Sequence, residues 1–185
     1  MTGQALTGRA ATGDKKVCGG WRAGDFCFNL SPVTVHGSRL LRLGWLLPVT
    51  YAAHVLEEWR GGFPAWWSRL TGVGLSVERF LSLNEIALAL MTFGVVLAYA
   101  VRPLRWLFVA FGAAVLLNAA SHLVACAATR SYSPGAITGA LLWLPLGWLV
   151  IRAGRDGLSR RSFAAGVAVG VAMHAVVALM ALLGG

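Results

Sequence analysis

Five apolar runs limit what this chain can fold into. They cover roughly residues 40–59, 80–101, 104–128, 134–151 and 163–183, and each is close to the ~20 residues that a helix needs to cross a ~30 Å hydrocarbon core. A segment in lipid must satisfy its own backbone hydrogen bonds, and a helix does so internally. The sequence therefore predicts an all-α fold, a polytopic membrane helical bundle of about five transmembrane helices.

The composition excludes most soluble classes. Hydrophobic residues make up 57% of the chain and charged residues 12%, whereas a soluble domain carries about 25% charged residues. The net charge of +9 would also suit nucleic acid, but the basic residues lie mainly between the apolar runs, where membrane proteins keep Lys and Arg. We therefore expect membrane lipid as a partner and no nucleic acid.

Two regions follow from the pattern. Residues 1–38 are rich in Gly, Thr and basic residues without an apolar period, which predicts a flexible basic N-terminal tail. Residues 39–185 form the predicted five-helix domain. The first apolar run follows basic residues as a signal peptide would, but it is too long and has no small-residue cleavage site before its charged end. We interpret it as a retained membrane helix.

The basic residues also predict an orientation. The N-terminal segment and the loops at 102–105 and 152–161 carry most of them and would share one side of the membrane. Cytoplasmic loops are enriched in Lys and Arg, so we expect a cytoplasmic N-terminus in the plasma (inner) membrane. The opposite side receives an uncharged C-terminus and only four arginines, namely Arg60, Arg69, Arg79 and Arg130.

The first apolar run ends in His54-Val-Leu-Glu57-Glu58. Positions i+3 and i+4 flank residue i on one helix face, so His54 lies between two carboxylates. Charged side chains at membrane depth are costly and mark functional sites. The alternative is that both glutamates face the interface and pair with Arg60, but the chain has only seven acidic residues and two adjoin this histidine. A site is the better interpretation, and either glutamate could point inward.

Two further helix ends carry polar residues. Ser82-Leu-Asn84-Glu85 matches a capping box, in which the glutamate reaches back to the N-cap amide. Glu85 therefore has two interpretations, a cap or a site residue. Asn118 and His122 stand at i, i+4 on the third helix, where a histidine often only bonds a neighbouring helix.

The last two runs add weaker candidates. Ser133-Pro134 is an ordinary helix start, with Ser as N-cap and Pro at the first position, so only Tyr132 keeps a functional interpretation, as a phenolic donor. Gly166, Gly170 and His174 recur every four residues. Small residues at this spacing predict close helix packing, which would bring His174 against a partner helix.

Alternating helix directions place these residues at one height. Because successive spans reverse direction, the polar ends fall in a single layer on the non-cytoplasmic side. We predict that the catalytic or metal-binding residues are His54, Glu57, Glu58, Glu85 and His122. We predict that the residues supporting them are Asn84, Asn118, Tyr132 and His174.

The motif resembles that of the HXXEE family, membrane proteins named for the pattern that stands here as His54-Val-Leu-Glu57-Glu58. The resemblance covers about residues 45 to 150. Other positions of the resemblance are Phe63-Pro64, Asn84, Asn118, His122 and Tyr132-x-Pro134-Gly135. The family has no assigned general activity, so the resemblance implies a site without a reaction.

We favour an enzyme that holds a divalent metal, iron, manganese or zinc, and that oxidises or hydrolyses a lipid or another apolar small molecule. Di-iron and di-manganese bundles use Glu and Glu-x-x-His ligands, and catalytic zinc uses His and Glu with an open position. Membrane desaturases and hydroxylases carry many more histidines than the four of this chain, which argues against the di-iron form.

Two alternatives need no metal. A carboxylic acid kept protonated by an apolar pocket, with His122 or His54 as the base, could isomerise or cyclise a prenyl-type lipid as terpene cyclases do. A proton-coupled carrier could use the same Glu and His residues as a relay. Carriers often contain repeats, and a homo-oligomer would supply the symmetry that this chain lacks.

Overall fold

The computed structural model describes residues 35–183, and this part of the chain consists of helices joined by short turns and loops, with no strand. The predicted tail lies outside the described residues except for its last four, which begin the first helix. The prediction of an all-α fold is confirmed. The helices are α1 (Val35–Gly44), α2 (Leu46–Arg60), α3 (Phe63–Thr71), α4 (Val77–Ala100), α5 (Trp106–Thr129), α6 (Ala136–Thr138), α7 (Leu144–Gly157) and α8 (Arg160–Leu182), with short turns η1 (Arg102–Leu104) and η2 (Gly139–Trp143).

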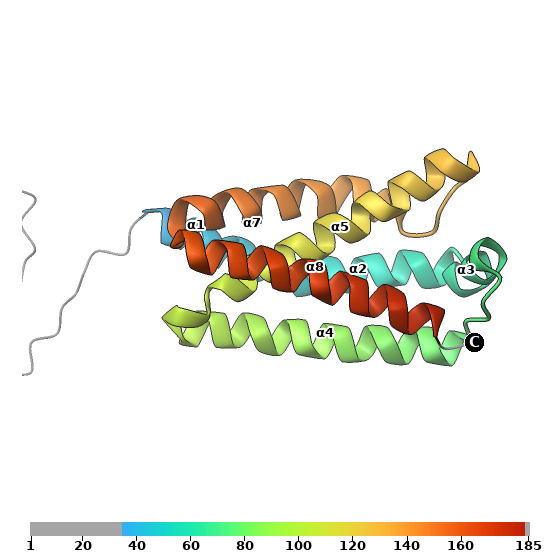
Figure 1. The fold of residues 1–185 in the computed structure, drawn as a ribbon, viewed down its shortest axis with the longest axis horizontal. Coiled ribbons are helices and arrows are strands. Elements are labelled where there is room, and N and C mark those ends of the chain that lie inside the picture. The colour runs from blue at the N-terminus through green and yellow to red at the C-terminus, as the bar shows by residue number, and fades with distance from the viewer. Residues whose placement is uncertain (1–34, 184–185) are drawn as a thin grey trace, which may run out of the picture. The chain divides into compact units, whose positions relative to one another are not determined.

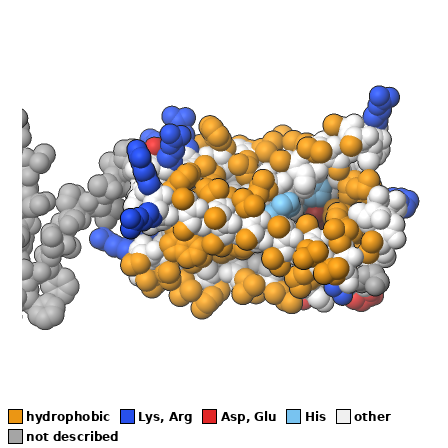
Figure 2. All heavy atoms as spheres, viewed as in Figure 1, with side chains coloured by type: hydrophobic (Ala, Val, Ile, Leu, Met, Phe, Trp, Pro, Cys, Tyr) orange, Lys and Arg blue, Asp and Glu red, His pale blue; other side chains and the backbone are white. Residues whose placement is uncertain are grey.

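Four helical segments are long and apolar enough to cross a membrane: Val77–Ala100, Arg102–Thr129, Ala136–Gly157 and Arg160–Leu182. They run along the bundle in Figure 1. Their outer faces are apolar, with Phe93 62% and Leu141 70% exposed, and hydrophobic side chains cover the visible face in Figure 2. Such a surface suits lipid rather than water.

The predicted first span is broken in two. Helix α1 ends at Gly44 and α2 begins at Leu46. The cause is Pro48, which has no N–H to donate to the Gly44 carbonyl and whose ring crowds that carbonyl. Helix α2 continues the course of α1 along the bundle (Figure 1), but neither piece is long enough to cross alone. The described residues therefore hold four complete candidate spans where about five were expected.

A second proline shapes the segment from α6 to α7. Pro145 also lacks an amide donor, and the turn before it, η2 at Gly139–Trp143, is π-helical. Such a widened turn accommodates the missing hydrogen bond without ending the helix. The segment begins at Ala136 and ends at Gly157, whereas the sequence predicted 134–151. Trp143 of this turn is 2% exposed.

Helix α5 lies at the centre of the bundle, against α7 and α8. A Cβ atom added to Gly170 would lie 2.3 Å from the Ala110 carbonyl oxygen, and one added to Gly166 would lie 2.8 Å from that of Trp106. Only glycine allows the backbones of α5 and α8 to approach this closely. The small-residue spacing of the last apolar run predicted this packing.

Helix α4 begins earlier than the sequence indicated. Ser76 is its N-cap and accepts a hydrogen bond from the Arg79 amide at 3.2 Å. Ser82 and Glu85 therefore lie inside the helix, where their amides bond within the helix ladder. The capping-box interpretation of Glu85 is wrong, because the helix is already capped by Ser76, six residues before Ser82.

Candidate metal centre

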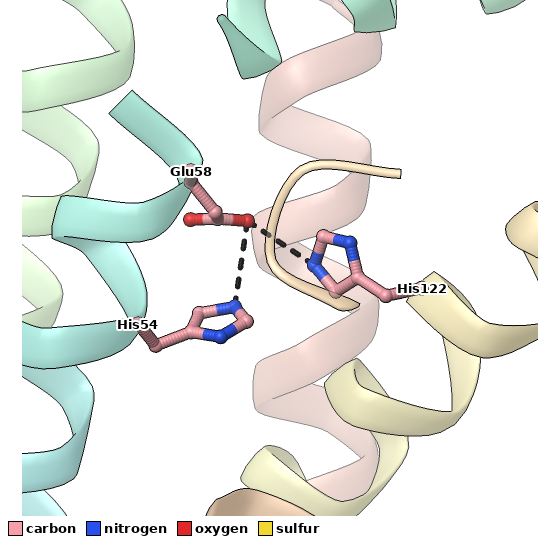
Figure 3. Close-up of side chains that lie close together, drawn as sticks. All are labelled: His54, Glu58 and His122. Carbon is pink, nitrogen blue, oxygen red and sulfur yellow. Dashed lines mark ion pairs between the residues drawn. The ribbon is translucent and has the colours of Figure 1, made fainter. Parts of the chain in front are cut away.

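Three buried side chains converge between α2 and α5. The Glu58 Oε1 atom lies 3.1 Å from His122 Nε2 and 3.5 Å from His54 Nε2. Figure 3 shows the carboxylate pointing between the two imidazole rings. His54, Glu58 and His122 are 1%, 5% and 4% exposed, and their ligand atoms all lie within 4.8 Å of one another. Two imidazole nitrogens and one carboxylate oxygen so placed could hold a metal ion.

The helix register explains which glutamate joins this cluster. His54 and Glu58 stand one turn apart on α2 and share a face. Glu57 is rotated about 100° from Glu58, and it turns toward the segment 132–138. Its carboxylate accepts five hydrogen bonds there, from the Tyr132 hydroxyl (2.6 Å), the amides of Gly135 (3.2 Å), Ile137 (3.0 Å) and Thr138 (2.6 Å), and the Thr138 hydroxyl (2.5 Å). Glu57 therefore anchors the start of α6 and is no part of the metal cluster.

Thr138 joins Glu57 to the cluster and fixes the His54 tautomer. Its hydroxyl donates its only proton to Glu57 Oε2, so it must accept from His54 Nδ1, which lies 2.8 Å away. His54 therefore carries a proton on Nδ1. In neutral His54 the lone pair lies on Nε2 and faces Glu58. A metal-binding histidine is normally oriented in this way through its other nitrogen.

The second histidine is held from the same segment. His122 Nδ1 lies 3.1 Å from the Ser133 hydroxyl, and the Ser133 amide donates to the Cys126 sulfur at 3.2 Å. Gly135, with φ +98°, packs between the rings, since an added Cβ would lie 2.8 Å from His122 Cε1 and 2.9 Å from His54 Cε1. The segment 132–138 therefore holds both histidine rings in position through Thr138, Ser133 and Gly135.

The sequence pattern does not reveal three of these supporting residues. It predicts Ser133 only as a helix cap and assigns no role to Thr138 or Trp143. The Trp143 ring stacks on His54 with a centroid distance of 3.7 Å. A threonine one turn after a Pro-Gly start is the only signal that was available, and it is weak, because its role depends on the approach of α2.

The remaining predicted residues divide into two groups. Glu85 is exposed on α4 and lines a separate shallow groove with Leu56 and Trp59, so it is not brought to the cluster. Asn84 accepts a hydrogen bond from the Tyr51 hydroxyl at 2.8 Å, on the wall of a cavity beside the cluster. The same wall includes Asn118 and His174.

This cavity gives the cluster access to a ligand. It has a volume of about 290 Å³, close to the lower limit of about 300 Å³ for ligand sites. Aromatic side chains of α3 form part of its wall. Besides His54 Nε2, three buried polar atoms of its lining residues have no hydrogen-bond partner among the described residues: Trp67 Nε1, Trp143 Nε1 and Asn118 Oδ1. A mostly apolar cavity with a few unsatisfied polar atoms is typical of a small-molecule site.

The fold and the site together define a helical bundle of membrane type with a buried His–Glu–His cluster. Residues 45–150 match the model of a family described as a protein of unknown function with HXXEE motif. The chain belongs to this family, and His54, Glu57 and Glu58 are the residues of its motif. No curated protein and no solved structure matches the chain significantly.

Proposed function

We propose that this protein is a membrane metalloenzyme in which His54, Glu58 and His122 bind one divalent metal ion. The observation that carries the proposal is the position of His54 Nε2, which lies 3.5 Å from the Glu58 carboxylate and has no hydrogen-bond partner among the described residues. When His54 is neutral with its proton on Nδ1, the Nε2 lone pair faces this carboxylate. Two electron-rich atoms buried face to face repel each other, and a cation between them removes both the repulsion and the desolvation penalty.

A single ion fits better than two. Di-iron and di-manganese bundles use four carboxylates, whereas the cluster in the described residues contains one, because Glu57 and Glu85 point elsewhere. Two histidines and one glutamate form the ligand set of mononuclear zinc hydrolases, which keep a further position open for water. In such sites the ion lowers the pKa of a bound water and polarises a carbonyl.

The surrounding residues suit hydrolysis of an apolar substrate. The cavity wall beside the cluster is mostly aromatic and aliphatic. Such a wall offers water few hydrogen bonds, so the ion would be the main binding position for water in the cavity. His174 also lines this wall, where a neutral imidazole could take the proton that the attacking water loses and pass it to the leaving group. The reaction we propose is therefore cleavage of an ester or amide bond in a lipid-like molecule.

Elemental analysis of the detergent-purified protein tests the metal. We expect near-stoichiometric zinc, iron or manganese in the wild type and its loss in His54→Ala and Glu58→Ala. Glu85→Gln is the matched control, because it removes an exposed glutamate of α4 and should leave the metal in place.

If no ion binds even after reconstitution with each metal, the metalloenzyme is refuted. The same three residues would then act through protons alone, as in an acid–base enzyme or a proton carrier. If iron binds and zinc does not, oxidation replaces hydrolysis as the reaction, since two histidines and one carboxylate also form the iron site of oxygenases.

We also propose that the N-terminus is cytoplasmic. The blue side chains in Figure 2 are arginines; most of those on the visible face lie at one end and a few at the other, and the histidine surface lies nearer the end with few. The positive-inside rule would put the arginine-rich end in the cytoplasm. Cysteines introduced at Arg155 and Arg130 should be labelled by impermeant maleimide from the inside and the outside respectively, and the reverse pattern would contradict the orientation.

A further inference from the structure

A second cavity continues from the metal centre along α4, α5 and α8. It has a volume of about 240 Å³ and shares six wall residues with the first: Tyr51, Leu83, Asn118, Trp143, His174 and Val177. On α5 the walls of the two cavities together extend from His122 of the cluster to Val115. This separation of seven positions corresponds to a depth of roughly 10 Å, at ~1.5 Å per helical residue.

The second cavity is apolar and opens sideways. Its own wall residues are aliphatic or methionine, among them Ile86, Leu90, Met91 and Val176. Helices α4 and α8 hardly touch each other, and Leu90 and Val176 on the two sides are 60% and 53% exposed. In a bilayer this gap faces hydrocarbon, so the cavity is accessible to a chain that is already dissolved in the membrane.

Polar atoms mark the junction of the two cavities. Trp143 is 2% exposed, and its Nε1 donor has no partner among the described residues; the Asn118 Oδ1 acceptor on the same wall has none either. Leaving such buried atoms unsatisfied destabilises the protein. A ligand that places a hydrogen-bonding group here, between the cluster and the apolar cavity, would satisfy both.

The walls also exclude one kind of head group. No Lys or Arg lines either cavity within the described residues, and phosphate groups are bound chiefly by such side chains. With a volume of about 240 Å³, the second cavity leaves space for one chain. Phospholipids, with two chains and a phosphate, fit neither feature.

From these observations we infer that the substrate is a single-chain amphiphile without phosphate. Its carbonyl-containing head lies at the metal centre, and its chain enters from the bilayer between α4 and α8 and occupies the second cavity. This inference rests on the proposed metal centre, and it adds the substrate class and the route of entry.

Straight-chain hydroxamic acids test the inference, because the hydroxamate binds the metal and the chain length can be varied. We would load the protein with metal and keep one detergent throughout. We would then measure how tightly acetohydroxamate and octanohydroxamate each bind to the protein-bound ion when they compete for it. Ala87→Trp fills the second cavity from α4, and Phe93→Trp, at an exposed position of the same helix, is the matched control.

We expect Ala87→Trp to weaken octanohydroxamate at least tenfold and to leave acetohydroxamate within twofold of the wild type, while Phe93→Trp changes neither. Partitioning of a hydroxamate into detergent micelles does not affect this result, because the affinity of each ligand is compared between the wild type and the variants in the same detergent. A second filling variant, Val176→Phe on α8, should repeat the result if Ala87→Trp does not fold.

Two failures can be told apart. If the wild type and both filling variants bind the two hydroxamates with the same ratio, the chain does not occupy this cavity and the inference is overturned, although the metal centre stands. If neither the metal nor acetohydroxamate binds to the wild type, the proposed function itself has failed, and the substrate inference is overturned with it.

Discussion

The carboxylate of Glu57 contacts His54 of the proposed metal centre only through Thr138, and Glu57→Gln tests whether this contact sets the metal affinity. The amide of glutamine can keep one oxygen toward Tyr132, Gly135 and Ile137, but its NH₂ group then faces the two donors of Thr138. The Thr138 hydroxyl must turn to accept from this NH₂ and donate to His54 Nδ1. The proton of His54 then moves to Nε2, the nitrogen that faces Glu58 and would bind the metal.

The size of the effect follows from these contacts. The Thr138 amide, now 2.6 Å from its acceptor, would lose it, at a cost of about 1 kcal/mol, the low end of the range for a donor that water can partly reach. The metal should be affected more. Changes in residues that orient metal ligands lower affinity about 10–100-fold, which corresponds to about 1.4–2.8 kcal/mol.

Competition with a chelator of known affinity measures the metal affinity directly. Tyr132→Phe is the matched control, because it removes one hydrogen bond to Glu57 but leaves the direction of the Thr138 hydroxyl unchanged; its metal affinity should stay within threefold of the wild type. If Glu57→Gln folds and binds the metal as tightly as the wild type, the tautomer argument is refuted.

Three further outcomes are expected. Gly135→Ala should abolish metal binding, because its Cβ would lie under 3 Å from both histidine rings at a backbone φ of +98°; retained metal would contradict the packing. Gly170→Ala should destabilise the protein by about 1–3 kcal/mol through overpacking of α5 against α8, measured by thermal unfolding beside Gly74→Ala, where no atom lies within 4 Å. Burial, and then the hydrogen bond to Glu57, raise the pKa of Tyr132 from 10.0 to about 12. The stabilisation that the protonated Tyr132 hydroxyl provides is therefore complete below pH 10.0 and is lost as the pH rises through about 12. A spectroscopic titration in which Tyr132 ionises at the same pH in the wild type and Glu57→Gln would contradict this.

The sequence determined the class of fold and the region of the site. Long apolar runs leave a chain in lipid only the helix, so the all-α bundle was predictable. The family motif and the second histidine were predictable too, because charged groups at membrane depth are rare and alternating helix directions give their heights. The break between α1 and α2 and the π-helical turn before α7 were harder to predict, although Pro48 and Pro145 mark their positions.

The tertiary structure decided which side chains meet. The sequence left Glu57 and Glu58 equivalent, because both flank His54 on a helix; the approach of α5 and of segment 132–138 from different sides separates them. Glu85 has the right height but the wrong face of α4. Thr138 gained its role only when α2 packed against the start of α6. Height along a helix follows from counting residues, whereas direction around it is fixed only by the packing of the neighbouring helices.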